Sequence, residues 1–246
     1  MSLTVGVLGG LGPEATLDFY AKLLRATPAA RDQDHLRVLL DVNPQVPDRN
    51  AALAGTGPSP APALIGMARG LEGAGADFLV LVCNTAHAWA AELQAAVDIP
   101  LVSLIGETVD EVARAGAERV GLLAADGALR AGLYQTALAE RGLDVLALSE
   151  AGQMRFMQLL YRIKAGHTGE AERAEMRALA AQLLDQGADL ILAGCTEVPL
   201  VLDQDDVSVP LVSSTDVLVR RTVVYATGEA SLPTGPARPE SGRAGP

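Results

Sequence analysis

Short runs of consecutive apolar residues alternate along this chain with longer, helix-like stretches. Several short runs are continuous in Val, Leu and Ile rather than alternating, which is typical of strands buried on both faces of a parallel sheet. The predicted strands span residues 5–8, 36–41, 78–82, 101–103, 119–123, 144–148, 190–193 and 211–213. The predicted helices span residues 14–26, 61–73, 86–96, 105–115, 129–141, 153–165, 170–186 and 215–227. Strands that alternate with helices predict an α/β fold with parallel sheets covered on both faces.

The chain also contains an internal repeat. Residues 75–83 align without gaps on residues 187–195, and both segments begin with Gly-Ala-Asp and end in cysteine. Matching strands follow each cysteine, Ile-Pro-Leu-Val-Ser after the first and Val-Pro-Leu-Val-Ser after the second. The repeat predicts two similar, pseudo-symmetric α/β halves, each with a mostly parallel sheet flanked by helices.

The repeat also suggests where the two domains begin and end. We expect residues 1–103 plus a returning segment, 214–227, to form the first domain, and residues 104–213 to form the second. Residues 228–246 are rich in Gly, Pro, Ser and charge, which predicts a disordered tail.

Composition narrows the class of function. The chain of 246 residues carries a formal net charge of −11 with dispersed basic residues, so nucleic acids and anionic membranes are poor partners. It has no run of 18 apolar residues, and its N-terminus lacks the pattern of a signal peptide, so we expect a soluble cytoplasmic protein. In that compartment its only two cysteines, Cys83 and Cys195, should be free thiols. Two cysteines and three scattered histidines make a structural zinc site improbable.

The two cysteines occupy equivalent positions of the repeat, each just past the end of a predicted buried strand. Ligand sites of open α/β sheets lie outside the carboxyl ends of the strands. Two halves that face each other would therefore bring Cys83 and Cys195 to one cleft. A lone cysteine is more often a small core residue, but equivalent positions in the repeat favour a functional pair.

Two opposed thiols suit racemisation, which removes a proton from one face of a carbon and delivers one to the other face. With the carbon between them, the two sulfurs should lie about 6–7 Å apart. Asn84, Thr85 and Thr196 follow the cysteines directly and supply donors for a substrate or a developing carbanion. His87 lies four residues after Cys83 and is either a base for that thiol or a core histidine.

Four motifs in this order resemble the aspartate/glutamate racemase superfamily, most closely its aspartate racemase branch. They are Gly-Gly-Leu-Gly-Pro-Glu-Ala-Thr at 9–16, Pro-Asp-Arg-Asn at 47–50, Cys-Asn-Thr-Ala-His at 83–87 and Gly-Cys-Thr-Glu at 194–197. The resemblance covers about residues 5–227. It implies a racemase that needs no pyridoxal phosphate, with Cys83 and Cys195 as the two bases. It further implies that Arg49 and Lys164 bind substrate carboxylates and that the protein is a homodimer.

The resemblance leaves the substrate open. Glutamate racemases typically carry histidine where this chain has Glu197, which favours aspartate over glutamate or a broader set of amino acids. Glu197 either tunes Cys195 or simply begins a helix, where an acid is favourable. Many relatives have threonine where this chain has Ala125 or Ala128, and a lost hydroxyl there bears on specificity.

The glycine-rich loop after the first strand permits a different function. Its Gly10-Leu11-Gly12 fits the pattern of a dinucleotide-binding loop, with Asp41 at the end of the next strand as a ribose-binding acid. A nicotinamide-dependent oxidoreductase would leave both cysteines unexplained, and Glu14 would lie near the pyrophosphate. In a racemase, the backbone at Gly10 would bind a substrate carboxylate instead. A catalytically silent protein that binds small dicarboxylates is a third possibility. We expect no cofactor and no metal.

Overall fold

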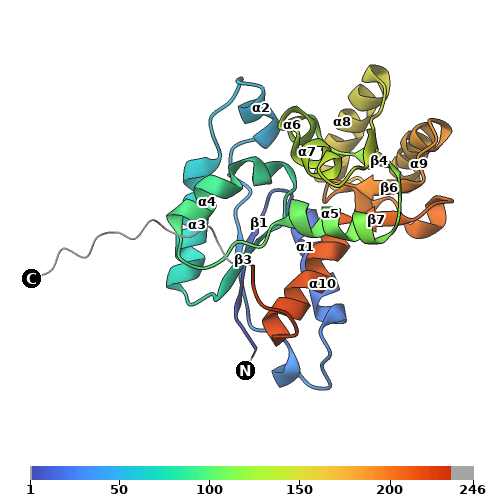
Figure 1. Ribbon diagram of the computed structural model, residues 1–246. Coiled ribbons are helices and arrows are strands. Elements are labelled where there is room, and N and C mark those ends of the chain that lie inside the picture. The colour runs from blue at the N-terminus through green and yellow to red at the C-terminus, as the bar shows by residue number, and fades with distance from the viewer. Residues whose placement is uncertain (1, 234–246) are drawn as a thin grey trace, which may run out of the picture.

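The computed structural model describes residues 2–233, which form two α/β halves joined by a returning C-terminal helix (Figure 1). The first sheet has the order β2-β1-β3 and the second has the order β5-β4-β6-β7, and every pairing is parallel. The strands are β1 (Val5–Gly9), β2 (Val38–Val42), β3 (Phe78–Leu81), β4 (Arg119–Leu123), β5 (Asp144–Leu146), β6 (Leu190–Ala193) and β7 (Leu211–Ser213). All residues of β1, β3 and β6 are buried. This confirms the expectation from their continuous apolar runs.

The helices lie outside the sheets and cover their faces (Figure 1). They are α1 (Pro13–Ala26), α2 (Arg49–Leu53), α3 (Ala61–Gly73), α4 (Ala90–Ala96), α5 (Leu104–Arg114), α6 (Asp126–Arg130), α7 (Leu133–Ala139), α8 (Glu150–Lys164), α9 (Glu170–Asp185) and α10 (Ser214–Thr227). The helix predicted at 129–141 is divided, because Gly132 adopts a left-handed φ of 64° between α6 and α7. The strand predicted at 101–103 is reduced to one bridge, between Leu79 and Leu101.

The two halves repeat each other in register as well as in order. Val5 pairs with Phe78 in the first sheet, and the equivalent Val120 pairs with Leu190 in the second. The shared Gly-Ala-Asp sequence has a structural role, because its aspartate carboxylate accepts a backbone N–H at the start of the central strand. Asp77 accepts from the Thr4 N–H at 2.6 Å, as Asp189 does from the Glu118 N–H at 3.0 Å. The prediction of two similar α/β halves is therefore confirmed.

The C-terminal helix α10 crosses back from the second sheet to the first half (Figure 1). Leu218, Val219 and Val223 of α10 share an apolar core with Val5 and Phe78 of the first sheet. The domain boundaries expected at residues 103 and 213 stay a prediction, which this packing supports.

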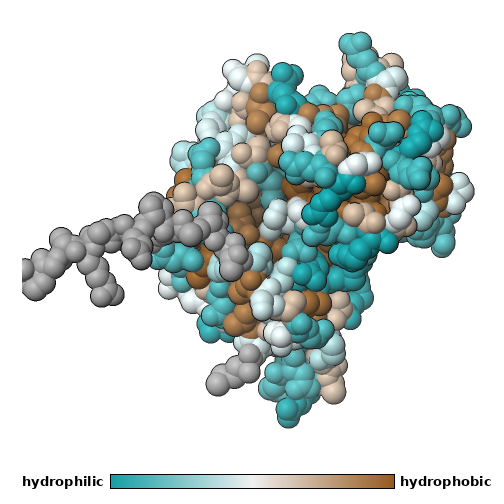
Figure 2. Space-filling model, viewed as in Figure 1, coloured by the Kyte–Doolittle hydropathy of each residue, from teal (hydrophilic) through white to brown (hydrophobic). Residues whose placement is uncertain are grey.

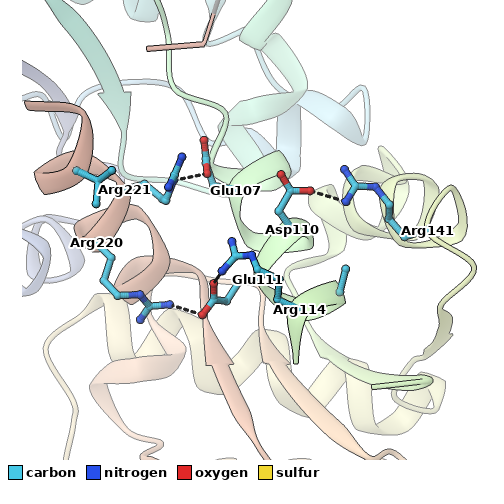
Figure 3. Close-up of a pocket in the computed structure, with 9 residues that line it drawn as sticks. Glu107, Asp110, Glu111, Arg114, Arg141, Arg220 and Arg221 are labelled. Atoms are coloured by element: carbon cyan, nitrogen blue, oxygen red, sulfur yellow. Dashed lines mark hydrogen bonds and ion pairs between the residues drawn. The ribbon is translucent and has the colours of Figure 1, made fainter. Parts of the chain in front are cut away.

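Ion pairs fasten α10 to α5, as Figure 3 shows. Arg220 pairs with Glu111 at 3.0 Å and Arg221 pairs with Glu107 at 2.6 Å. These residues line a cavity of about 630 Å³ on the surface, where hydrophilic side chains gather between α5 and α10 (Figure 2). Neither cysteine lines this cavity, and its charges serve to hold the two helices together.

The end of α10 continues into the first residues of the expected tail. Gly228 ends the helix with a φ of 77°, and Ala230 and Leu232 pack against the core of the first half. Residues 234–246, the remainder of the expected tail, lie outside the described residues. None of the described helices combines the length and apolar character that crossing a membrane requires.

The close packing of β4 generates the first prediction. A Cβ atom added to Gly121 would lie 2.9 to 3.0 Å from side-chain carbons of Ile191, Leu183 and Ala188. We expect Gly121→Ala to lower the free energy of unfolding by about 1–3 kcal/mol through overpacking, measured by urea denaturation. The matched control is Gly66→Ala in α3, where nothing lies within 4 Å of the added atom; it should raise stability by up to about 1 kcal/mol. Equal effects of the two changes would contradict the packing argument.

Candidate active site

A narrow cavity of about 10 Å³ lies between the two halves, just beyond the ends of β3 and β6. Eight of the nine predicted site residues line it, namely Arg49, Cys83, Asn84, Thr85, Lys164, Cys195, Thr196 and Glu197. The remaining lining residues are Leu11, Asn50, Ala125 and Leu160. That volume has room for about one water molecule.

Both cysteines are buried, and both are free thiols. Cys83 follows β3 in the first half and Cys195 follows β6 in the second, and both line the cavity. The sequence argument that two equivalent strand ends bring the thiols to one site is thus matched by the structure. The separation of the two sulfurs, expected at about 6–7 Å, stays a prediction.

Cys195 has a carboxylate as its hydrogen-bond partner. Its Sγ donates to Glu197 Oε2 at 3.0 Å, and the same oxygen accepts the Thr196 hydroxyl at 3.1 Å. Burial and the neighbouring Glu197 carboxylate raise the pKa of the Cys195 thiol well above its usual value. In this form of the site Cys195 is therefore a protonated thiol, ready to give a proton rather than to take one.

Lys164 balances the charge of Glu197. It ends α8 and forms an ion pair with Glu197 Oε1, while its Nζ also donates to the Leu11 carbonyl at 3.1 Å. Burial by itself lowers the pKa of Lys164, but the adjacent Glu197 carboxylate outweighs it and raises that pKa. A cation is thus fixed beside both thiols.

Arg49 supplies a second cation, from the first half. It is the first residue of α2, a short helix that the sequence analysis did not predict and that Asp48 caps by accepting the Ala51 N–H. Its guanidinium donates to the carbonyls of Val46, Pro47 and Leu11 at 2.8 to 3.1 Å. Arg49 and Lys164 therefore converge on the Leu11 carbonyl from opposite halves.

Gly10 is the one predicted site residue that does not line the cavity. Its N–H donates to Thr16 Oγ1 at 2.9 Å, so it is already occupied within the loop. Its φ of 89° and its approach to the backbone of Asn43 explain why this position is glycine. The nearby Gly12 faces Glu197, whose Oε1 would lie 2.7 Å from an added Cβ. A carboxylate in that place opposes the binding of a pyrophosphate and disfavours the nicotinamide alternative.

His87 is a core residue rather than a base for Cys83. Its Nε2 accepts the Leu104 N–H at 3.1 Å, which leaves Nδ1 to donate to the Cys83 carbonyl at 2.8 Å. Burial lowers the pKa of His87, so the ring stays neutral. Both nitrogens are used by the backbone, and neither contacts the thiol.

Asn84 lines the cavity, but its side chain is committed to the protein interior. Its Nδ2 donates to Ser214 Oγ at 3.0 Å, and its Oδ1 accepts the hydroxyl of Tyr134. Sequence reasoning missed Tyr134 and Ser214. The only signal for them is a break in the repeat, where Gly194 stands opposite Val82.

Fold and site together define a two-part α/β enzyme with a pair of thiols in one cavity between its halves. A family model described as Asp/Glu/Hydantoin racemase matches residues 8–222. The chain belongs to the Asp/Glu/Hydantoin racemase family, and it is a racemase, an enzyme of the isomerase class.

Several known proteins similar to the chain are named racemases. It is 28% identical over 225 residues to the broad specificity amino-acid racemase of Bacillus subtilis, covering 89% of this chain and 96% of the relative. The aspartate racemase of Picrophilus torridus has a TM-score of 0.84 at 27% identity, covering 92% of this chain and 94% of that chain. A glutamate racemase of Pseudomonas aeruginosa is 36% identical over 130 residues, which is 52% of this chain and 48% of that enzyme.

The contact between Cys195 and Glu197 generates the second prediction. Glu197→Gln removes the negative charge that raises the pKa of Cys195 and leaves Lys164 beside it, so that pKa should fall. We would measure thiolate absorbance against pH in a Cys83→Ser background, so that only Cys195 titrates. Glu150→Gln, at the exposed start of α8, is the matched control and should leave the titration unchanged. An unchanged Cys195 titration in Glu197→Gln would show that the carboxylate does not tune the thiol.

Proposed function

We propose that this protein is a racemase of small dicarboxylic amino acids, with aspartate as the first candidate, and that Cys83 and Cys195 act on opposite faces of the α-carbon. The observation that carries the proposal is the pair of buried free thiols at equivalent strand ends of the two halves, both lining one cavity. Neither a dinucleotide-binding protein nor a silent binding protein requires that pair.

The two thiols supply a complete set of proton transfers. The thiolate of Cys83 takes the α-proton, so a C–H bond breaks and an S–H bond forms. The Cys195 thiol then gives its proton to the opposite face of the carbanion and becomes a thiolate. For the other enantiomer the roles are exchanged. Lys164 lies beside both cysteines and stabilises whichever thiolate is present. Because the two thiols carry both proton transfers, the proposed reaction needs no pyridoxal phosphate, nicotinamide or metal.

The charges around the cavity fit a dicarboxylic amino acid. Arg49 and Lys164 contribute two positive charges, which Glu197 and the proposed Cys83 thiolate balance. Aspartate has two carboxylates, and the cavity offers a cation to each of them. The Arg49 guanidinium has five N–H donors in a planar fork, and those that the three carbonyls leave free suit a carboxylate.

Substrate choice depends on the apolar part of the lining. Ala125, Leu11 and Leu160 line the cavity, and Ala128 is buried, with an exposed fraction of 1%. Alanines without hydroxyl groups do not fix a side-chain carboxylate by themselves, so the cations must do so. Assays with single enantiomers of aspartate, glutamate and neutral amino acids decide between a dicarboxylate-specific and a broad-specificity enzyme.

An outer pocket of about 300 Å³ adjoins the cysteine cavity, and Asn50 lines both. Asn50 joins the halves across this boundary, because its Oδ1 accepts the Gly127 N–H at 2.9 Å and its Nδ2 contacts Tyr161 Oη at 3.4 Å. Both contacts must loosen before an amino acid reaches the thiols. The outer pocket is thus the route of access that we assign to the substrate.

We also assign the protein to the cytoplasm as a homodimer. Leu17 and Leu24 of α1 and Leu40 and Val42 of the edge strand β2 are exposed apolar residues that a second copy of the chain would cover. The molar mass in solution, compared with 25.4 kDa for one chain, decides the assembly.

Replacing each cysteine in turn tests the proposed function. A serine hydroxyl is a far weaker acid than a thiol and cannot hold the ionised role. Cys83→Ser and Cys195→Ser should each abolish racemisation of aspartate, assayed without added cofactor. Each variant should still exchange the α-hydrogen of one enantiomer with deuterated water, and the two variants should prefer opposite enantiomers. If either variant keeps near-normal racemisation, the two-thiol mechanism is wrong.

A further inference from the structure

A buried chain of hydrogen bonds connects the residues next to the two cysteines. Asn84 follows Cys83 directly and has an exposed fraction of 2%. Its Nδ2 donates to Ser214 Oγ at 3.0 Å, and Ser214 Oγ donates to the carbonyl of Ala193 at 2.9 Å. Ala193 is the last residue of β6, two positions before Cys195. The end of β3 is thus connected to the end of β6 through one serine hydroxyl.

Tyr134 makes a second connection between the same two places. Its hydroxyl donates to Asn84 Oδ1, and its ring lies against Gly194, where an added Cβ would be 3.0 and 3.2 Å from two ring carbons. Tyr134 is fully buried, and burial raises the pKa of its hydroxyl, so it stays a donor. Asn84 is therefore held against both residues that precede Cys195, Ala193 through Ser214 and Gly194 through Tyr134.

These contacts occur where the internal repeat fails. Val82 stands in the first half where Gly194 stands in the second. Phe19 corresponds to Tyr134, because each lies 14 residues after the equivalent residues Val5 and Val120. Phe19 and Val82 belong to one apolar core. The second half therefore has a hydroxyl on the aromatic ring, in Tyr134, and no side chain at the strand end, in Gly194. Both changes are needed for the hydroxyl to reach across to Asn84.

We propose that Asn84, Tyr134 and Ser214 are positioning residues that fix how Cys83 and Cys195 face each other. Tyr134 and Ser214 do not line the cavity, so they act through the strand ends and not by touching a substrate. The inference rests on the proposed two-thiol function. It assigns the side chain of Asn84 to the alignment of the cysteines, whereas its sequence motif suggested a substrate ligand.

A positioning role predicts that two reactions respond differently when the connection is lost, whereas a purely structural role predicts that both respond alike. Racemisation needs both thiols aligned on one carbon, whereas exchange of the α-hydrogen with retention of configuration needs only one. Misplacement of a reacting group by 1 Å can cost about 100-fold in rate. Loosening the connection should therefore slow inversion more than it slows exchange with retention.

Tyr134→Phe is the sharpest variant, because it removes one oxygen and keeps the ring against Gly194. Ser214→Ala breaks the other connection and serves if the tyrosine variant does not fold. In deuterated water we would follow deuterium in the substrate enantiomer and in the product enantiomer, starting from one pure enantiomer. We expect kcat for racemisation to fall about tenfold or more, with KM within about twofold. The ratio of inversion to exchange with retention should fall several-fold.

Thr222→Val is the matched control. Thr222 lies on α10 like Ser214, is fully buried, and donates its hydroxyl only to Leu218 in its own helix, at 2.6 Å. This change should leave the ratio of inversion to exchange as it is in the wild type, whatever its effect on the melting temperature.

Two results would overturn the inference, namely an unchanged ratio in both Tyr134→Phe and Ser214→Ala, or an equal fall in both rates that follows the loss of thermal stability. A wild-type protein that inverts and exchanges no amino acid would instead contradict the proposed function, and the inference would fall with it.

Discussion

The proposed two-thiol function depends on holding two strand ends, from separate sheets, at one fixed spacing. A proton relay across a single carbon works only if both thiols reach it, and a free thiol at a strand end has no covalent link to its partner. The link here is polar and buried, made by Asn84, Ser214 and Tyr134. Buried hydrogen bonds of this kind are costly to break, because a buried polar group left without a partner costs about 1–3 kcal/mol. They therefore specify one arrangement of the halves where an apolar contact would tolerate several.

The charges of the site make the two similar halves chemically different. The second half provides Lys164 and Glu197, and the carboxylate holds Cys195 as a thiol. The first half provides Arg49, which has no acidic partner within the described residues and donates to backbone carbonyls instead. A symmetrical scaffold thus carries an unsymmetrical set of charges. Under the proposed mechanism the thiols act on opposite faces, so both must reach the α-carbon although their charged neighbours differ.

Much of the fold could be predicted from local sequence, because continuous apolar runs and their repetition are local properties. The repeat also led to both cysteines, and the residues that follow them directly gave Asn84, Thr85 and Thr196. Arg49, Lys164 and Glu197 came from the family resemblance, and all six line the cavity. What failed depended on contacts that no local pattern records. Gly10 was expected to bind substrate, but its N–H is used by Thr16 six residues later. The helix predicted at 129–141 is divided by Gly132, whose left-handed conformation is decided by the surrounding fold.

The cross-half connection was missed for the same reason. Tyr134 looks like any aromatic core residue of a helix, and only the folded chain shows that its hydroxyl meets Asn84 from the other half. The sequence already shows that the repeat has Val82 in the first half and Gly194 at the equivalent position of the second. A glycine at that position has many explanations. Departures from an internal repeat are therefore as informative as its matches once a structure shows what fills the space.

The central claim is that two groups on opposite faces move the proton, and one isotope measurement tests it most directly. The wild-type protein is given a single protiated enantiomer of aspartate in deuterated water, and both enantiomers are analysed by mass spectrometry during the first few per cent of conversion. Two opposed thiols predict that the product enantiomer carries deuterium at the α-carbon from the start, while the remaining substrate gains deuterium more slowly. Product that retains the original hydrogen would show that one group carries the proton across both faces, and it would contradict the account.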